Sequence, residues 1–173
     1  MKKPDAQASA LKKQDSIAMA VAEIESELGE QQLATIYVER IRTQRTRSFK
    51  LNATAREVEI LQTLLGVELK IGKRRMSCPD WATARYLAVF ARLGVTEIAV
   101  PYDITQISRL ADKLESGWFQ MLSLGEQASQ GQTPRWRNRL LKALLSRQRA
   151  TVTAAGAGPA TPQFIQQTKQ RRK

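Results

Sequence analysis

The sequence predicts an α+β or small α/β fold, and three observations lead to this expectation. The chain has 173 residues and is 42% hydrophobic, which is enough apolar material to bury one core. Between residues 66 and 117, strand-like apolar runs alternate with segments whose apolar residues recur at helical spacing, which indicates a compact strand-helix-strand-helix core. The flanking segments indicate N-terminal helices, a basic C-terminal amphipathic helix and a disordered tail.

Residues 1–51 are predicted to form a helical, partly basic N-terminal segment. Residues 1–14 are polar and are expected to be a frayed end. Asp15 or Ser16 is suited to cap a helix whose apolar positions recur at helical spacing, and Gly29 is suited to end it.

The second half of this segment, residues 31–51, leaves helix and strand nearly equally favoured, because helically spaced apolar residues include β-branched and aromatic types. A short strand is expected near residues 48–51. Five basic residues within eleven positions exceed what a solvated face needs and form a candidate phosphate-binding surface. They are Arg40, Arg42, Arg45, Arg47 and Lys50.

Residues 52–125 are predicted to form the globular core. The stretch Thr54-Ala55-Arg56-Glu57 has the form of a capping box, and it predicts a helix that ends at Gly66. A strand over residues 67–71 and a charged turn follow. The basic residues of this turn could contact phosphates, and a solvated turn explains them equally well: Lys73, Arg74 and Arg75.

A strongly apolar helix is expected to lie at the centre of this core. Asp80 is placed to cap it, and Gly94 is suited to end it in a left-handed conformation. We expect Trp81 and Phe90 to be buried, because apolar residues cover most of the circumference of the helix.

The second predicted strand, residues 95–100, leads to a helix that Asp103 caps and Gly117 ends. An apolar cluster at 118–124 closes the core.

If residues 67–78 and 95–100 form parallel strands of one sheet, a small ligand could bind at its carboxyl edge. Two capping aspartates explain the same residues without a ligand, and both interpretations stay open. The residues that would meet at this edge are Cys78, Asp80, Tyr102 and Asp103.

One local pattern resembles a known family. Residues 54–61, together with Leu65-Gly66 and Leu93-Gly94-Val95, resemble the two ends of a LuxR-type helix-turn-helix module over about forty residues. That family carries a scaffold helix and a recognition helix in the interval, whereas this chain has a strand-like run, Gly72 and Pro79. The chain is therefore not assigned to the family.

Residues 126–133 are predicted to be a linker, and Thr133 followed by Pro134 begins a helix over residues 134–149. The apolar face of this helix is suited to a partner groove. It comprises Trp136, Leu140, Leu141, Leu144 and Leu145. Its other positions carry a third basic group, which comprises Arg135, Arg137, Arg139, Lys142, Arg147 and Arg149.

The formal net charge of +12 is distributed unevenly along the chain. Residues 132–173 hold 10 Lys/Arg and no Asp/Glu, whereas residues 52–131 hold 9 of each kind. Residues 150–173 are predicted to be a disordered basic tail, in which Arg171 and Arg172 complete the candidate phosphate-binding residues.

The chain has no His and one Cys, Cys78. Zinc sites of the Cys/His type, and Ser-His-Asp or Cys-His catalysis, cannot be built from these residues, so we expect no zinc, no cofactor and no enzymatic activity. A small enzyme that works through Cys78, Tyr102 and Asp103 is the least favoured alternative. The sequence favours a cytoplasmic protein, because it has a single Cys, no secretory signal and no membrane-spanning apolar run.

These features favour a non-enzymatic nucleic-acid-binding protein, or an accessory factor of a nucleic-acid machine such as the ribosome or RNA polymerase. RNA and DNA are not distinguished, since the sequence has neither an RNP-like aromatic motif nor an intact helix-turn-helix. The alternative is a protein-interaction adaptor that docks through residues 134–149, or a protein whose same helix lies on an anionic membrane surface.

Overall fold

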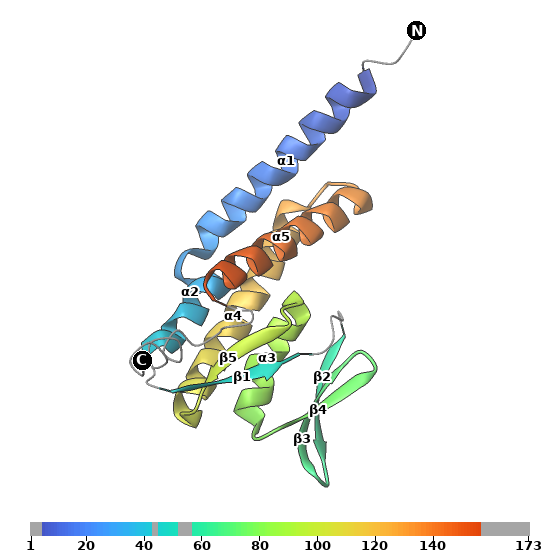
Figure 1. The fold of residues 1–173 in the computed structure, drawn as a ribbon. Coiled ribbons are helices and arrows are strands. Elements are labelled where there is room, and N and C mark those ends of the chain that lie inside the picture. The colour runs from blue at the N-terminus through green and yellow to red at the C-terminus, as the bar shows by residue number, and fades with distance from the viewer. Residues whose placement is uncertain (1–4, 43–44, 52–56, 157–173) are drawn as a thin grey trace, which may run out of the picture.

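The computed structural model describes residues 5–42, 45–51 and 57–156, and it confirms an α+β fold. The helices are α1 (Asp5–Leu28), α2 (Leu33–Val38), α3 (Trp81–Leu93), α4 (Ile104–Ala128) and α5 (Pro134–Ala154), with the short 3₁₀ helices η1 (Gly29–Gln31) and η2 (Glu39–Arg42). The strands are β1 (Thr46–Lys50), β2 (Val58–Thr63), β3 (Gly66–Ile71), β4 (Arg74–Cys78) and β5 (Glu97–Pro101). Helices α1, α4 and α5 pack against one another, while the strands lie around α3 at the other end of the molecule (Figure 1).

The strands form two small antiparallel sheets, one of β1 and β5 and one of β2, β3 and β4. Residues 67–78 and 95–100 therefore do not lie parallel in one sheet, and the condition for a ligand site at a shared carboxyl edge is not met. Two buried tyrosines close the outer edge of β5. The Ala99 N–H donates to the Tyr37 hydroxyl at 3.2 Å, and the Tyr86 hydroxyl donates to the Ala99 carbonyl at 3.2 Å. No further strand can pair at this point, because both backbone groups are already satisfied.

The helix predicted up to residue 65 is wrong over residues 58–65, which form β2 and the turn into β3. The capping-box residues 54–56 lie outside the described part of the chain. The helical spacing of the apolar residues here was misleading, because Leu64 and Leu65 are fully exposed at the hairpin turn and do not join the core. Val58 is buried as an inward-facing strand residue instead. The resemblance to a helix-turn-helix module depended on this helix.

Helix α3 lies at the centre of the core, as predicted. The Asp80 carboxylate accepts the Thr83 N–H at 2.7 Å, and Gly94 ends the helix with a φ of 82°. Phe90 is fully buried, which confirms its predicted position. The burial predicted for Trp81 is wrong, because this first helical residue is 48% exposed at the end of the packed turns.

Helix α4 begins as predicted, with the Asp103 carboxylate accepting the Thr105 N–H at 2.9 Å. It then continues to Ala128, so the predicted stop at Gly117 is wrong. Gly117 instead allows a close contact between α4 and a neighbouring segment. A Cβ atom at this position would come closer than 3.0 Å to the Gln31 carbonyl oxygen, and its absence lets η1 approach the helix.

The N-terminal segment is helical first and extended later. Helix α1 is continuous from Asp5, so the predicted start at Asp15 or Ser16 is wrong. Its first half projects beyond the other helices (Figure 1). Helix α2 and strand β1 resolve the ambiguity over residues 31–51, and the strand expected near residues 48–51 is confirmed as β1.

Helix α5 belongs to the same hydrophobic core as the central segment. Leu140, Leu144 and Val152 are buried together with residues of α1, α2, α3 and α4. The helix also continues beyond its predicted end at residue 149, to Ala154. The orientation of α5 is therefore set by core packing over most of its length.

Candidate nucleic-acid interface

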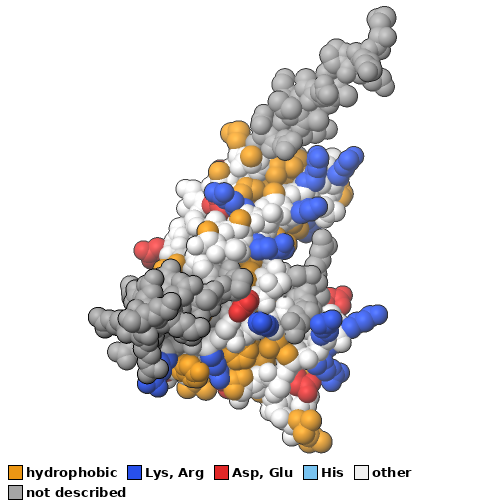
Figure 2. Space-filling model, in the orientation of Figure 1, with side chains coloured by type: hydrophobic (Ala, Val, Ile, Leu, Met, Phe, Trp, Pro, Cys, Tyr) orange, Lys and Arg blue, Asp and Glu red, His pale blue; other side chains and the backbone are white. Residues whose placement is uncertain are grey.

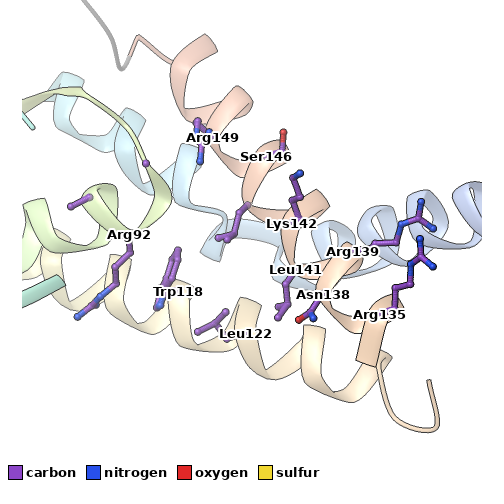
Figure 3. A pocket seen from close by; sticks show the side chains of 13 residues that line it. Arg92, Trp118, Leu122, Arg135, Asn138, Arg139, Leu141, Lys142, Ser146 and Arg149 are labelled. Carbon is purple, nitrogen blue, oxygen red and sulfur yellow. The ribbon is translucent and has the colours of Figure 1, made fainter. Parts of the chain in front are cut away.

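A groove of about 1060 Å³ lies where α5 packs beside α3 and α4 (Figure 3). Its floor is apolar and consists of Trp118 and Leu122 from α4 with Leu141 and Leu145 from α5. Basic residues surround the floor, and none of the described residues that line the groove is acidic. These basic residues are Arg92, Arg135, Arg139, Lys142 and Arg149.

Helix α5 places three of these cations in one row. Thr133 begins the helix as predicted, and its hydroxyl accepts the Trp136 N–H at 3.3 Å. The buried Leu140 and Leu144 hold the opposite side of the helix against the core. The cations follow one another at intervals of four and three residues, which keeps them on one side of the helix. This α5 row consists of Arg135, Arg139 and Lys142.

The α5 row holds the groove cations whose donors are not used by the described residues of the protein itself. Its three side chains are exposed, and none of them forms a hydrogen bond or ion pair with a residue that the structure describes. The other two groove cations keep their positive charge, but each already donates to a backbone carbonyl. Arg92 Nη2 donates to the Val58 carbonyl at 3.5 Å. Arg149 Nε donates to the Leu93 carbonyl at 2.9 Å and so satisfies the C-terminal end of α3.

The remaining basic residues of α5 are bound to carboxylates. Arg137 forms an ion pair with Glu126 of α4. Arg147 Nε lies 3.3 Å from Glu25 Oε1 of α1. Neither arginine lines the groove, so the net positive field of α5 is concentrated on the side of the α5 row.

The apolar face of α5 that was predicted to dock onto a partner is divided between the core and the groove. Leu140 and Leu144 are buried in the protein's own core. Trp136 is half-buried, and its indole N–H donates to a serine hydroxyl of α1 at 3.4 Å. Leu141 and Leu145 line the groove. A partner helix cannot use the whole face, because α1, α2, α3 and α4 already cover most of it.

The basic group of residues 40–50 lies apart from the groove, and two of its members have structural contacts. The Arg40 guanidinium lies 3.6 Å from the centre of the Tyr37 ring. Arg47 Nη2 lies 4.0 Å from Asp80 Oδ2. The other members lie at the end of η2 or are exposed on and beside β1: Arg42, Arg45 and Lys50.

The turn between β3 and β4 forms a second exposed basic group. Lys73 and Arg74 are exposed there, and Arg75 Nη1 lies 3.6 Å from Glu68 Oε2 on β3. Figure 2 shows Lys and Arg side chains gathered over α5 and, separately, at this turn. The predicted tail arginines lie outside the described residues: Arg171 and Arg172.

The edge site that the sequence left open around Cys78 has neither the sheet edge nor the reactive thiol that a ligand or enzyme site would need. Asp80 and Asp103 cap two helices, and Tyr102 is exposed. Burial, together with the neighbouring Asp80 carboxylate, raises the pKa of the Cys78 thiol to about 11. The thiol is thus protonated at neutral pH and is a poor nucleophile.

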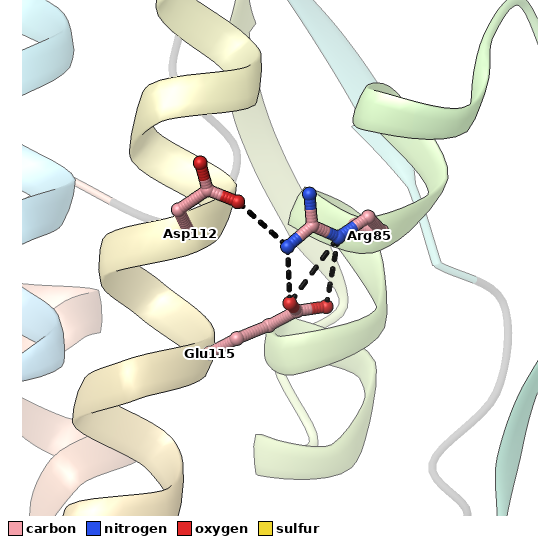
Figure 4. Close-up of polar contacts among 3 residues, drawn as sticks. All are labelled: Arg85, Asp112 and Glu115. Carbon is pink, nitrogen blue, oxygen red and sulfur yellow. Dashed lines mark hydrogen bonds and ion pairs between the residues drawn. The ribbon is translucent and has the colours of Figure 1, made fainter.

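Arg85 joins α3 to α4 (Figure 4). Its Nη2 donates to Asp112 Oδ1 at 2.7 Å, and its Nε donates to both Glu115 carboxylate oxygens at 3.2 Å. The hydrogen bonds to Glu115, and then those to Asp112, raise the pKa of the guanidinium above its ordinary value. The single positive charge of Arg85 offsets one of the two negative charges of Asp112 and Glu115, and the contacts hold α3 against α4.

The sequence did not indicate the groove as a site. Trp118 and Leu122 were assigned to the apolar cluster that closes the core, and Trp118 is indeed only 8% exposed. The available signal was on α3, where Arg92 follows Arg85 by seven residues and therefore lies on the same side of the helix. That spacing indicates a basic side of α3, but it does not show that α5 lies beside it.

No protein-family model, curated protein or solved structure matches this chain. Within residues 5–42, 45–51 and 57–156, no helix is long and apolar enough to cross a membrane. The same residues contain no group of three His, Cys, Asp or Glu side chains that could hold a metal ion.

Proposed function

We propose that the protein is a non-enzymatic nucleic-acid-binding protein, or an accessory factor of a nucleic-acid machine, that contacts the phosphate backbone with the α5 row. One observation carries the proposal. Three exposed cations without described partners lie in line beside a groove whose described lining residues include no carboxylate. Backbone phosphates offer a matching line of negative charge.

The spacing of the α5 row suits a nucleic-acid backbone. Arg135 and Lys142 are seven residues apart, which corresponds to about 10 Å along the helix axis at 1.5 Å per residue. One strand of a duplex rises ~3.4 Å per nucleotide, so the row extends over about three phosphates. Neutralising three phosphates predicts a contribution of roughly −2 to the slope of log K against log salt for a single strand, and of roughly −3 for a duplex.

Charge-neutralising variants test this proposal without removing α5. Oligonucleotides of about 12 nucleotides exceed the row several-fold in length at ~3.4 Å per nucleotide. Their affinity would be measured by fluorescence anisotropy between about 50 and 200 mM salt. The triple variant Arg135→Gln, Arg139→Gln and Lys142→Gln should bind more weakly, and its salt slope should be smaller by about 2.

A matched control removes three exposed positive charges elsewhere. The variant Arg45→Gln, Lys73→Gln and Arg74→Gln has the same net charge as the α5 triple variant, and its side chains also lack described ion pairs. It should keep most of the affinity and most of the salt slope. Equal losses in the two variants would show that only net charge matters and would refute the α5 row as the site. Absence of binding at the lowest salt would refute the proposed function.

The adaptor function is supported less well. A helix that docks through its apolar face must leave that face free, and Leu140 and Leu144 are buried within the chain. We further propose a cytoplasmic setting, since the single Cys78 forms no disulfide within the chain and a buried thiol is stable in a reducing compartment. The proposal covers RNA and DNA alike.

A further inference from the structure

We propose that the groove binds a single strand of nucleic acid rather than a duplex, with phosphates on the α5 row and bases against the apolar floor. This inference rests on the proposed function and specifies its ligand. It follows from a difference between two of the helices that line the groove, since α5 contributes a row of cations and α4 contributes only apolar residues (Figure 3).

The groove cations without described partners form one row on one helix, whereas Arg92 of α3 already donates to the Val58 carbonyl. On the α4 side, the described lining residues are Trp118 and Leu122, and neither can pair with a phosphate. A duplex presents two charged strands and keeps its bases stacked between them, so it would cover this apolar side without using it. A single strand has phosphates along one edge and unstacked bases along the other, and it matches both sides at once.

Phe119 extends the apolar side toward solvent. It precedes Leu122 of the groove lining by three residues in α4, so the two side chains are neighbours on the surface of the helix. Its side chain is 63% exposed, whereas that of Trp118 is 8% exposed. Within the described residues, Phe119 is not stacked on another ring. A groove that carries a cationic row, with an exposed aromatic ring next to one of its apolar lining residues, offers both contacts that a single strand uses.

Other anionic ligands fit the groove less well. A single anionic headgroup would use one or two of the cations, whereas the three of the α5 row are spaced over ~10 Å of helix axis. An acidic peptide could pair with the row, but its helix or strand would offer no flat ring surface for Phe119. The repeated charge and the exposed ring together favour a polymer with a phosphate and a base in each unit.

The test compares single-stranded DNA, single-stranded RNA and a duplex of the same sequence, using the full chain and fluorescence anisotropy. Phe119→Ala should weaken binding of at least one single strand by about fivefold or more, since a stacked base contributes ~1–3 kcal/mol. Its salt slope should be unchanged, because no charge is removed. The matched control is Ile104→Ala, which removes another exposed apolar side chain of α4, 55% exposed, at the far end of the helix from the groove. It should bind like the natural chain.

The outcomes separate this inference from the proposed function. If the duplex binds as tightly as both single strands, or if Phe119→Ala weakens duplex and single strands equally, single-strand binding is refuted. The proposed function then still stands if the α5 triple variant shows the smaller salt slope. If a polyglutamate peptide or vesicles of anionic phospholipid bind through Phe119 while no oligonucleotide binds, both proposals are refuted.

Discussion

Two glycines of α4 provide a matched test of the packing described above. Gly117 and Gly125 both lie inside the helix and are buried, so replacing either with alanine should gain about 1 kcal/mol of helix propensity. Their neighbours differ. A Cβ at Gly117 would come closer than 3.0 Å to the Gln31 backbone carbonyl, which can move only if η1 moves. A Cβ at Gly125 would meet two side-chain methyl groups, at 3.3 Å and 3.5 Å.

The free energies of unfolding should therefore move in opposite directions. Overpacking typically costs about 1–3 kcal/mol, and a rigid backbone neighbour places Gly117→Ala toward the upper end of that range. We expect this variant to be less stable than the natural chain by about 1–2 kcal/mol after the propensity gain. Gly125→Ala should be as stable as the natural chain or more stable by up to about 1 kcal/mol, since leucine methyl groups adjust easily.

Urea denaturation followed by far-ultraviolet circular dichroism measures both variants on the same scale. A Gly117→Ala protein at least as stable as Gly125→Ala would refute the close approach of η1 to α4. A fall in the denaturant slope of either variant would indicate a changed unfolded or native state, in which case the comparison would be made by thermal unfolding as well.

Three further predictions concern α3 and the cysteine that precedes it. Phe90→Ala should cost about 3–5 kcal/mol of unfolding free energy, whereas Trp81→Ala should cost much less because the Trp81 side chain is half exposed. Equal costs of the two substitutions, measured by urea denaturation, would contradict the described burial. The Cys78 thiol, whose pKa is raised to about 11, should react with a disulfide reagent far more slowly at pH 8 than the unfolded chain does, and a fast reaction would contradict its burial. The folded thiol keeps its proton to higher pH than the unfolded thiol does, so its stabilising effect is present below about pH 8.5 and is lost as the pH rises toward 11. The Cys78→Ala variant should therefore lose less unfolding free energy over that pH interval than the natural chain loses.

Capping signals gave the accurate part of the sequence-based prediction. Asp80, Asp103 and Thr133 each begin a helix in the structure, because a side-chain oxygen that satisfies a free N–H acts within a few residues of its own position. Gly94 ends a helix for an equally local reason, since its φ of 82° favours glycine. Signals of this kind do not depend on distant parts of the chain.

The errors arose where distant residues decide the structure. Gly117 resembles a helix stop in sequence, yet it is the point at which η1 approaches α4. Leu64 and Leu65 continue a helical spacing, but hydrogen bonding between β2 and β3 overrides that spacing. The strand pairing of β5 with β1 is likewise non-local, as Ser48 lies opposite Ala99. Local periodicity carries no information about these partners.

The candidate site likewise combines a feature that the sequence indicated with features that depend on distant residues. The α5 row lies within the basic helix that the sequence identified, whereas the groove also needs Trp118 from α4 and Arg92 from α3. Which basic residues of α5 remain available depends on the carboxylates nearby, and Glu25 and Glu126 engage two of them. The sequence therefore indicated the charged helix but not its available side.

Because α5 serves both the core and the groove, its contribution to binding cannot be tested by deleting it. Removal of residues 132–173 would expose the surfaces that Leu140, Leu144 and Val152 cover and leave a gap beside α1 and α4. Each buried aliphatic side chain contributes ~1.5–3 kcal/mol, so the loss approaches the whole stability of a domain, about 5–15 kcal/mol. A truncated protein that fails to bind would then report unfolding, whereas glutamine substitutions in the α5 row change charge on an exposed surface and leave the core intact.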